Sequence, residues 1–320
     1  MDPIHSERDL HRLRLASSAH AVIAAWSGAG HFDVLSDGVP RLLSTLKGSQ
    51  RALRMTAPIL AHIGLLIEDR GHWAMSQSAL ALHARGAFDW TGAEEAMAGL
   101  VKLDEVLRTG TLVRKTDIGV SEEDPDKARA FMNMLYRRSG ASVKEVVRWL
   151  SPRLDPGARI LDLGGGHGRY SDALTEGGFD VTMFDLPVCA ALARERHGTD
   201  FQAIAGDFMK DDLAGPYDAI FLSNIIHGLG AEKIVALYRR LREAIVPGGQ
   251  LVVKDMFVDD LGASSELAQF FRLTMLMYTE DGGSYTLAEH TEFLTASGFV
   301  PAGHVMVSDQ GFALVFGVAE

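Results

Sequence analysis

The fold is decided by the stretch Arg159-Ile-Leu-Asp-Leu-Gly-Gly-Gly-His-Gly-Arg169. A short apolar run ends at Leu163, four glycines follow between positions 164 and 168, and a helical pattern resumes near Tyr170. This order predicts a strand, a tight turn and a helix. Glycine permits positive φ and lets a ligand approach the main chain with no Cβ in the way, and the following helix offers free N–H groups. The stretch therefore predicts a loop that holds a nucleotide-like ligand.

The spacing of the glycines separates the classes of nucleotide. A dinucleotide-binding loop requires glycine at its first, third and sixth positions. Gly164 and Gly166 satisfy two of these, but Arg169 occupies the sixth, and no Gly-Lys-Ser/Thr follows. The remaining pattern, Asp162-x-Gly-x-Gly-x-Gly, indicates a ligand with an amino-acid group and a nucleoside but no phosphate. A tight structural turn is the alternative, and His167 inside the loop has no assigned role.

From residue 158 onward predicted strands alternate with helices, which is typical of a parallel sheet covered by helices on both faces. The last two apolar runs, 301–307 and 311–318, are separated by three residues. A parallel crossover needs about a dozen residues, so these two strands are expected to pair antiparallel. The other predicted strands are 159–163, 180–185, 201–205, 217–222 and 250–257, with a helix over 234–245 that ends at Pro247-Gly248-Gly249.

Acidic residues follow two of these strands. Ligands of open α/β sheets bind beyond the carboxyl ends of the strands. Asp185 ends the second predicted strand, where a carboxylate can accept both hydroxyls of a ribose. Asp207 and Phe208 follow the third, where a carboxylate and a ring suit the amino group and flat face of adenine. Each acid alone is also typical of a helix cap or a turn, but their register with the glycine loop favours a nucleoside site.

The composition indicates a globular protein. Hydrophobic residues make up 47% of the 320 residues and charged residues 23%, with a formal net charge of −11. An acidic surface disfavours nucleic acid and anionic membranes as partners. Cys189 is the single cysteine, which predicts no internal disulfide and a cytoplasmic location. We find neither a signal-peptide pattern nor an apolar run long enough to span a membrane.

Residues 1–120 are predicted to form a separate, mostly helical domain. Helical patterns over 10–26, 39–46 and 51–66 precede two short strands joined at Asp69-Arg70-Gly71, the outline of a winged helix. DNA binding is one alternative, but residues 1–100 hold nine Lys and Arg against ten Asp and Glu. That balance cannot neutralise phosphates, so we favour dimerisation. The second predicted domain is 121–320, which includes linking helices over 127–150.

Together these motifs resemble the class I S-adenosylmethionine-dependent methyltransferases, and specifically the small-molecule O-methyltransferases with an N-terminal winged-helix dimerisation domain. The resemblance covers nearly the whole chain. It implies a Rossmann-like α/β sheet of seven strands with the last strand antiparallel, S-adenosyl-L-methionine as the cofactor, no metal, and a homodimer. It rests on Leu161-Asp-Leu-Gly-Gly-Gly-His-Gly168, Phe184-Asp-Leu-Pro187, Gly206-Asp-Phe208, Ser223-Asn-Ile-Ile-His227, Val246-Pro-Gly-Gly249 and the tail from Tyr285-Thr286 to Ser297-Gly-Phe299.

The resemblance also implies roles for individual residues. His227, after the fourth strand, matches a histidine that removes the proton of a phenolic hydroxyl, and Asp255 matches an acid that orients this histidine. A phenol with a pKa near 10 is mostly neutral at pH 7, and an imidazole with a pKa of about 6.5 can accept its proton. Capping or core roles are the alternatives. The implied cofactor residues are Asp162, Gly164, Gly165, Gly166, Asp185, Leu186, Asp207, Phe208 and Ser223.

Two departures from the family pattern matter. Gly228-Leu229 follows the histidine where plant members have Asp-Trp, and Ser284 or Tyr285 replaces a second acid near Gly282-Gly283. Proton removal then rests on His227 and Asp255 alone or does not take place. Proteins of this fold also bind the same cofactor and catalyse hydroxylation, decarboxylation or pericyclic reactions, so fold alone does not settle the chemistry. C- or N-methyl transfer is a further alternative.

Phe131, Met132, Met275 and Tyr278 are the candidate substrate contacts, because their helices are expected to cover the catalytic opening. Methionine adapts to flat, irregular aromatic surfaces, although ordinary core packing is the alternative. The sequence thus predicts an O-methyltransferase of secondary metabolism that acts on a hydroxylated aromatic or polyketide-like small molecule. Its expected partners are this substrate and a second copy of the chain, with neither nucleic acid nor membrane.

Overall fold

A computed structural model of the chain describes residues 4–88, 93–110, 112, 120, 124–198, 200–258, 266–308 and 311–320. The chain divides into two units, Met1–Lys102 and Leu103–Glu320. The domain boundary predicted between residues 120 and 121 lies in a stretch where, from 111 to 123, only 112 and 120 are described. That boundary stays a prediction.

The first unit is mostly helical and contains one small antiparallel sheet of order β1-β3-β2. Its core is formed by apolar side chains from the helices, among them Trp26, Phe32, Leu35, Leu53 and Leu60. The mostly helical character was predicted, and its winged-helix role stays a prediction. The elements are α1 (Glu7–Gly28), α2 (His31–Leu35), β1 (Arg41–Leu42), the 3₁₀ turn η1 (Leu43–Thr45), α3 (Gln50–His62), β2 (Leu66–Asp69), β3 (His72–Met75), α4 (Gln77–Ala84) and α5 (Ala93–Leu100).

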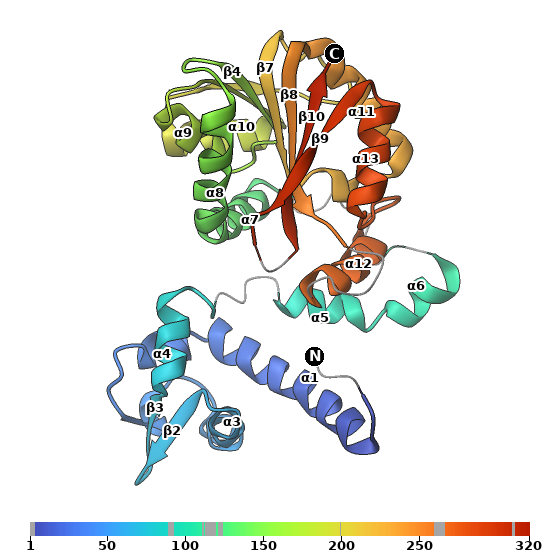
Figure 1. Ribbon diagram of the computed structural model, residues 1–320. Helices are drawn as coiled ribbons and strands as arrows, with labels where there is room; N and C mark the ends of the chain where they lie inside the picture. The colour runs from blue at the N-terminus through green and yellow to red at the C-terminus, as the bar shows by residue number, and fades with distance from the viewer. Residues whose placement is uncertain are drawn as a thin grey trace. The chain divides into compact units, whose positions relative to one another are not determined.

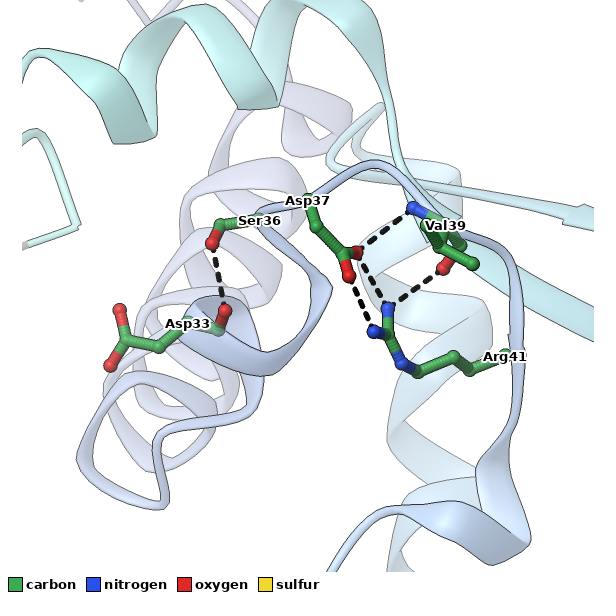
Figure 2. A network of polar contacts seen from close by, with 5 residues as sticks. All are labelled: Asp33, Ser36, Asp37, Val39 and Arg41. Carbon is green, nitrogen blue, oxygen red and sulfur yellow. Dashed lines mark hydrogen bonds and ion pairs between the residues drawn. The ribbon is translucent and has the colours of Figure 1, made fainter.

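The helix predicted over 39–46 is wrong. This stretch forms the two-residue strand β1 and the short turn η1. Figure 2 shows the polar contacts that hold it extended: the Asp37 carboxylate accepts hydrogen bonds from the Val39 N–H at 3.0 Å and from both terminal guanidinium nitrogens of Arg41, which also donates to the Val39 carbonyl. Side-chain bonds of this kind compete with helix formation, and β1 gains further bonds by pairing with Trp73 and His72 of β3.

The second unit is built on a seven-stranded sheet of order β6-β5-β4-β7-β8-β10-β9 (Figure 1). β10 is antiparallel to both neighbours and the remaining pairs are parallel, which confirms the predicted antiparallel last strand. The helices are α6 (Leu103–Thr109), α7 (Pro125–Arg138), α8 (Gly140–Leu150), α9 (Arg169–Glu176), α10 (Pro187–His197), α11 (Ala231–Ala244), α12 (Glu266–Tyr278) and α13 (Leu287–Ala296), with 3₁₀ turns η2 (Ser151–Arg153) and η3 (Ile226–Gly228). The strands are β4 (Arg159–Leu163), β5 (Asp180–Asp185), β6 (Gln202–Ala205), β7 (Tyr217–Ser223), β8 (Ile245–Met256), β9 (Phe299–Met306) and β10 (Phe312–Ala319).

Helices cover both faces of this sheet. In Figure 1, α8, α9 and α10 lie on one side and α11 and α13 on the other. Side chains alternate along a strand, so Ile160 packs with the first group of helices and Leu161 with the second. The central strands are therefore apolar on both faces, as in other parallel sheets. Polar side chains are left to the strand ends, where the four central strands β5, β4, β7 and β8 finish at one edge.

No helix in the described ranges of the chain is long and apolar enough to cross a membrane. No group of three or more His, Cys, Asp and Glu side chains in those same ranges is arranged to hold a metal ion.

Candidate active site

The glycine turn after β4 leaves no room for side chains. Gly164 has a φ of +71°, a conformation that L side chains rarely adopt. A Cβ built there would come within 3.0 Å of the Ile225 side chain and would lie 4.0 Å from Cε1 of Phe208. The bare backbone of the turn thus meets the residues that follow β6 and β7. Phe208 is predicted at this edge from the sequence, whereas the contact of Ile225 is visible only in the structure.

The next two glycines close the other side of the turn. A Cβ at Gly165 would lie 2.7 Å from Met183 Cγ and 2.8 Å from Asp162 Oδ2, and one at Gly166 would lie 3.2 Å from Met132 Sδ. Side chains of neighbouring elements therefore pack closely around Gly164, Gly165 and Gly166, which we call the glycine cradle. Met132, predicted to contact substrate, lies against this cradle from α7.

Asp185 fastens the glycine loop to the end of β5. Its Oδ2 accepts a hydrogen bond from the Gly166 N–H at 2.6 Å, and its Oδ1 accepts one from the Leu186 N–H at 2.7 Å. Burial raises the pKa of Asp185, while these two backbone bonds favour the carboxylate. The carboxylate is therefore held in one orientation at the strand edge, and its contact with a ribose stays a prediction.

Asp207 stabilises its own turn after β6. Its Oδ1 accepts from the Met209 N–H at 2.9 Å, and its Oδ2 lies 2.7 Å from Lys210 Nζ. The hydrogen bond from Lys210 holds the pKa of Asp207 below its usual value. Asp207 thus has the turn-forming role that is the alternative reading of its sequence position. Contact of Asp207 and Phe208 with an adenine stays a prediction.

Asp162 is a buried acid with an unused oxygen. It is 1% exposed, and its Oδ2 accepts a hydrogen bond from Ser171 Oγ at 2.6 Å. Oδ1 is buried and has no hydrogen-bond partner among the described residues. Burial raises the pKa of Asp162 to about 7. This buried carboxylate oxygen lies beside the glycine turn. It fits the cationic amino group of an amino-acid ligand, because a charged hydrogen-bond donor would satisfy it.

His227 and Asp255 are brought together at the same edge of the sheet. His227 lies in η3, and its Nδ1 is 2.7 Å from Oδ1 of Asp255, which is 0% exposed. The Met256 N–H also donates to this oxygen at 2.7 Å. Burial opposes ionisation of Asp255, but the electrostatic interaction and hydrogen bond with His227 outweigh it and lower the pKa of Asp255. A carboxylate at Nδ1 fixes the tautomer that leaves Nε2 as the acceptor.

The loop before α13 packs on the backbone around His227. The Gly283 N–H donates to the His227 carbonyl at 2.9 Å, and the Tyr285 hydroxyl donates to the Leu229 carbonyl. Burial raises the pKa of Tyr285 to about 12. Tyr285 therefore keeps its proton and acts as a structural donor.

The remaining predicted residues have varied surroundings. Ser223 ends β7 and pairs with Lys254 of β8. Phe131 and Tyr278 are half-buried on α7 and α12, whereas Met275 on α12 is 1% exposed. Their contact with a substrate stays a prediction.

His167 acquires a structural role. Its Nδ1 accepts a hydrogen bond from the Arg169 N–H at 3.1 Å, at the start of α9. Burial lowers the pKa of His167 to about 4, so the ring is neutral and suited to accept this bond. Its ring also meets Tyr136 edge to face, with centroids 5.8 Å apart. The histidine thus satisfies the first N–H of α9, the helix that follows the glycine turn.

Two further residues near the site were not identified from the sequence. Phe271 of α12 meets the His227 ring edge to face, with centroids 4.9 Å apart. Lys254 is 2% exposed, lies 4.2 Å above the Phe312 ring and donates to Asn224 Oδ1 at 3.1 Å. Burial lowers its pKa to about 8. A lysine inside the apolar run of β8 was a visible signal, whereas helical spacing does not reveal which ring of α12 faces the site.

The chain is similar to several known proteins. A profile of the O-methyltransferase domain matches residues 111–300, more than half of the chain. The tetracenomycin polyketide synthesis 8-O-methyltransferase TcmO of Streptomyces glaucescens is 30% identical over 65% of this chain, and the match spans 63% of TcmO, just under two thirds of its length. The 3-hydroxy-5-methyl-1-naphthoate 3-O-methyltransferase of Streptomyces sahachiroi is 26% identical over 84% of this chain and 82% of its own. The solved structure of PigF with SAH shares the fold, with a TM-score of 0.84 at 19% identity over 98% of this chain and 100% of that one.

Proposed function

Because the chain belongs to the S-adenosylmethionine-dependent O-methyltransferase family, we propose that it methylates a hydroxyl group of an aromatic or polyketide-like small molecule. The observation that carries the proposal is the 2.7 Å contact between His227 Nδ1 and Asp255 Oδ1 at the sheet edge that also carries the glycine cradle. TcmO and the naphthoate methyltransferase, whose names place them on polyketide and naphthoate substrates, support this substrate class and a role in secondary metabolism.

The cradle residues suit S-adenosylmethionine. The unpartnered Oδ1 of Asp162 would receive the amino group, and the backbone of Gly164 to Gly166 would hold the methionine end. Asp185 would receive the ribose hydroxyls. Asp207 and Phe208 would border the adenine, with Leu186 and Ser223 beside them. When bound, this cofactor supplies a methyl group already activated by the sulfonium charge.

The chain then has to align the acceptor and remove a proton. His227 Nε2 accepts the proton of the substrate hydroxyl as that oxygen becomes the nucleophile. The buried carboxylate of Asp255 stabilises the imidazolium that results. The remaining rate acceleration comes from positioning. Holding the cofactor and the acceptor side by side at the carboxyl ends of the strands lowers the barrier of a bimolecular transfer.

The test is a product analysis. The purified chain is incubated with S-adenosylmethionine and a panel of hydroxylated aromatic compounds, and products are examined by mass spectrometry and NMR. We expect a gain of one CH₂ unit, an O-methyl signal and release of S-adenosylhomocysteine. Conversion of a compound without consumption of the cofactor would contradict methyl transfer. A new C- or N-methyl signal would contradict the assignment to oxygen.

Asp162 makes the affinity for the cofactor depend on pH. Without a ligand the pKa of Asp162 is raised to about 7. Between pH of about 4 and about 7 the folded chain therefore retains a proton that the unfolded chain loses, and folding stability falls as the pH rises through this range. A cationic amino group prefers the carboxylate, so binding expels this proton. We expect affinity for S-adenosylhomocysteine to rise between pH 6 and 8, with net proton release seen by calorimetry in two buffers.

Asp162→Asn is expected to remove this proton release and to weaken binding roughly ten- to hundredfold, the loss of one hydrogen bond to a charged group. Asp155→Asn is the matched control, because Asp155 is an exposed acid in the turn before β4. Proton release that persists in Asp162→Asn would assign the titration to another group.

The N-terminal unit is proposed to mediate a homodimer. It exposes large apolar side chains: Leu10 and Leu13 on α1 are 48% and 39% exposed, Met55 and Ile59 on α3 are 64% and 39% exposed, and Ile63 directly after α3 is 41% exposed. Apolar patches of this kind mark interaction surfaces. Light scattering is expected to give twice the chain mass for the wild type and the single chain mass for a Leu13→Glu, Ile59→Glu variant. A wild-type monomer would contradict the proposal.

A further inference from the structure

The hydrogen bond to Asp255 does not by itself fix the plane of the His227 ring. Within the described parts of the chain, the imidazole is held by one hydrogen bond, from Nδ1 to Asp255 Oδ1 at 2.7 Å. A ring anchored at one nitrogen can still pivot about the axis of that bond. The His227 side chain is only 13% exposed, so the groups packed against it decide how far it turns. The direction of Nε2 depends on those groups.

Phe271 is an aromatic residue packed on this ring. It lies on α12, and its ring plane is inclined by 86° to that of His227, with centroids 4.9 Å apart. This is the edge-to-face arrangement that aromatic rings favour. A pivot of the imidazole would break this geometry. Asp255 and Phe271 therefore restrain the ring from two different elements, β8 and α12.

We propose that Phe271 is a positioning residue that fixes the plane of the His227 imidazole, so that Nε2 faces the hydroxyl group to be methylated. The inference rests on the proposed role of His227 as the base. It assigns to α12 a task separate from covering the substrate, and it concerns a residue that the motifs of the chain do not mark.

The chain offers a matched control at the neighbouring position. Adjacent helical residues point about 100° apart, and Phe270 is 56% exposed whereas Phe271 is half-buried against His227. Replacing either phenylalanine with leucine removes the same aromatic ring from the same helix. Only the change at Phe271 removes a contact with the imidazole.

The first measurement is kinetic, with the hydroxylated compound that gives an O-methyl product. Phe271→Leu is expected to lower kcat roughly two- to tenfold, the equivalent of one aromatic ring pair, with little change in KM or in the affinity for S-adenosylhomocysteine. Phe271→Tyr is expected to restore kcat, because the ring is retained. Phe270→Leu is expected to match the wild type. Equal kcat values for the two leucine variants would overturn the proposal.

A double-mutant cycle tests whether Phe271 acts through His227. In a His227→Ala background, Phe271→Leu is expected to cause no further loss of the residual rate. A further loss of the same size would mean that Phe271 acts on the substrate directly, which overturns the positioning role. Full activity of His227→Ala alone would instead contradict the proposed base, so the two failures are distinguishable.

A spectroscopic measurement needs no substrate. In the chain saturated with S-adenosylhomocysteine, the imidazole protons of His227 can be followed by NMR and identified by their loss in His227→Gln. Phe271→Leu is expected to shift the Hε1 signal, because the ring current is lost, and to speed solvent exchange of the Nδ1 proton. Phe270→Leu is expected to do neither. Unchanged His227 signals in Phe271→Leu would overturn the proposal even if kcat fell.

Discussion

Replacing His227 with alanine is expected to lower the rate of methyl transfer by roughly 10²-fold or more, with nearly unchanged affinity for S-adenosylhomocysteine. The size follows from the contribution of a positioned general base. The affinity is retained because the proposed cofactor contacts lie in β4, on the glycine turn and at the ends of β5, β6 and β7, and not on η3. Rates are measured as S-adenosylhomocysteine release under saturating substrate, and affinity by calorimetry.

Loss of the imidazole also affects the fold. Asp255 has a lowered pKa, caused by His227 against the opposing effect of burial, so the pair stabilises the folded chain above the usual carboxyl pKa and this stability is lost as the pH falls. His227→Asn is therefore the second variant, because its amide can still donate to the buried carboxylate. We expect it to be as inactive as His227→Ala but more stable to heat.

A histidine away from the site provides the control. His304 is exposed on β9, and His304→Ala is expected to keep the wild-type rate. Unchanged turnover in both His227 variants would contradict the role of His227 as the general base. It would also favour a reaction in which the substrate loses no proton to the protein.

Substituting Gly164 with valine is expected to abolish measurable binding of the cofactor. The φ of +71° is strained for any L side chain, and most of all for a β-branched one. The new Cβ would also come within 3.0 Å of the Ile225 side chain. The turn would have to move away from the position in which Asp185 holds it through the Gly166 N–H. Binding of S-adenosylhomocysteine is measured by calorimetry.

Gly157 separates strain from loss of the site. Its φ is +79°, but a Cβ there would meet nothing within 4 Å. Gly157→Val is therefore expected to lose some stability and to retain cofactor affinity. Retained affinity in Gly164→Val would show that the ligand binds elsewhere. Circular dichroism of both variants checks that the chain remains folded.

Most of the second unit could be predicted from the sequence because its signals are local. Apolar runs, the glycine turn and Pro247-Gly248-Gly249 mark where strands and helices change. Local signals also misplace some elements. β8 begins at Ile245, before that Pro-Gly-Gly segment, because Ile245 pairs with Tyr217 and the register then shifts so that Gln250 pairs with Ala219. Pairing with a neighbouring strand extended this element beyond the break that the sequence marks.

The short helix predicted over 39–46 failed for a similar reason. Its apolar spacing suits a helix, but the contacts of Asp37 with Val39 and Arg41 hold the chain extended (Figure 2). These hydrogen bonds depend on side-chain rotamers, and β1 is also held by its pairing with β3. The spacing of apolar residues gives information on neither.

By itself the sequence determined the alternating sheet, the glycine turn, the acids at the strand ends and the position of His227 after β7. Each of these follows from a short stretch whose residue types limit the backbone. Tertiary structure alone decided that Asp162 keeps a buried oxygen with no partner among the residues that the structure describes, that Tyr285 donates to Leu229, and that Phe271 packs on His227. These contacts join segments distant in the chain, and their geometry depends on how helices rotate and pack against the sheet.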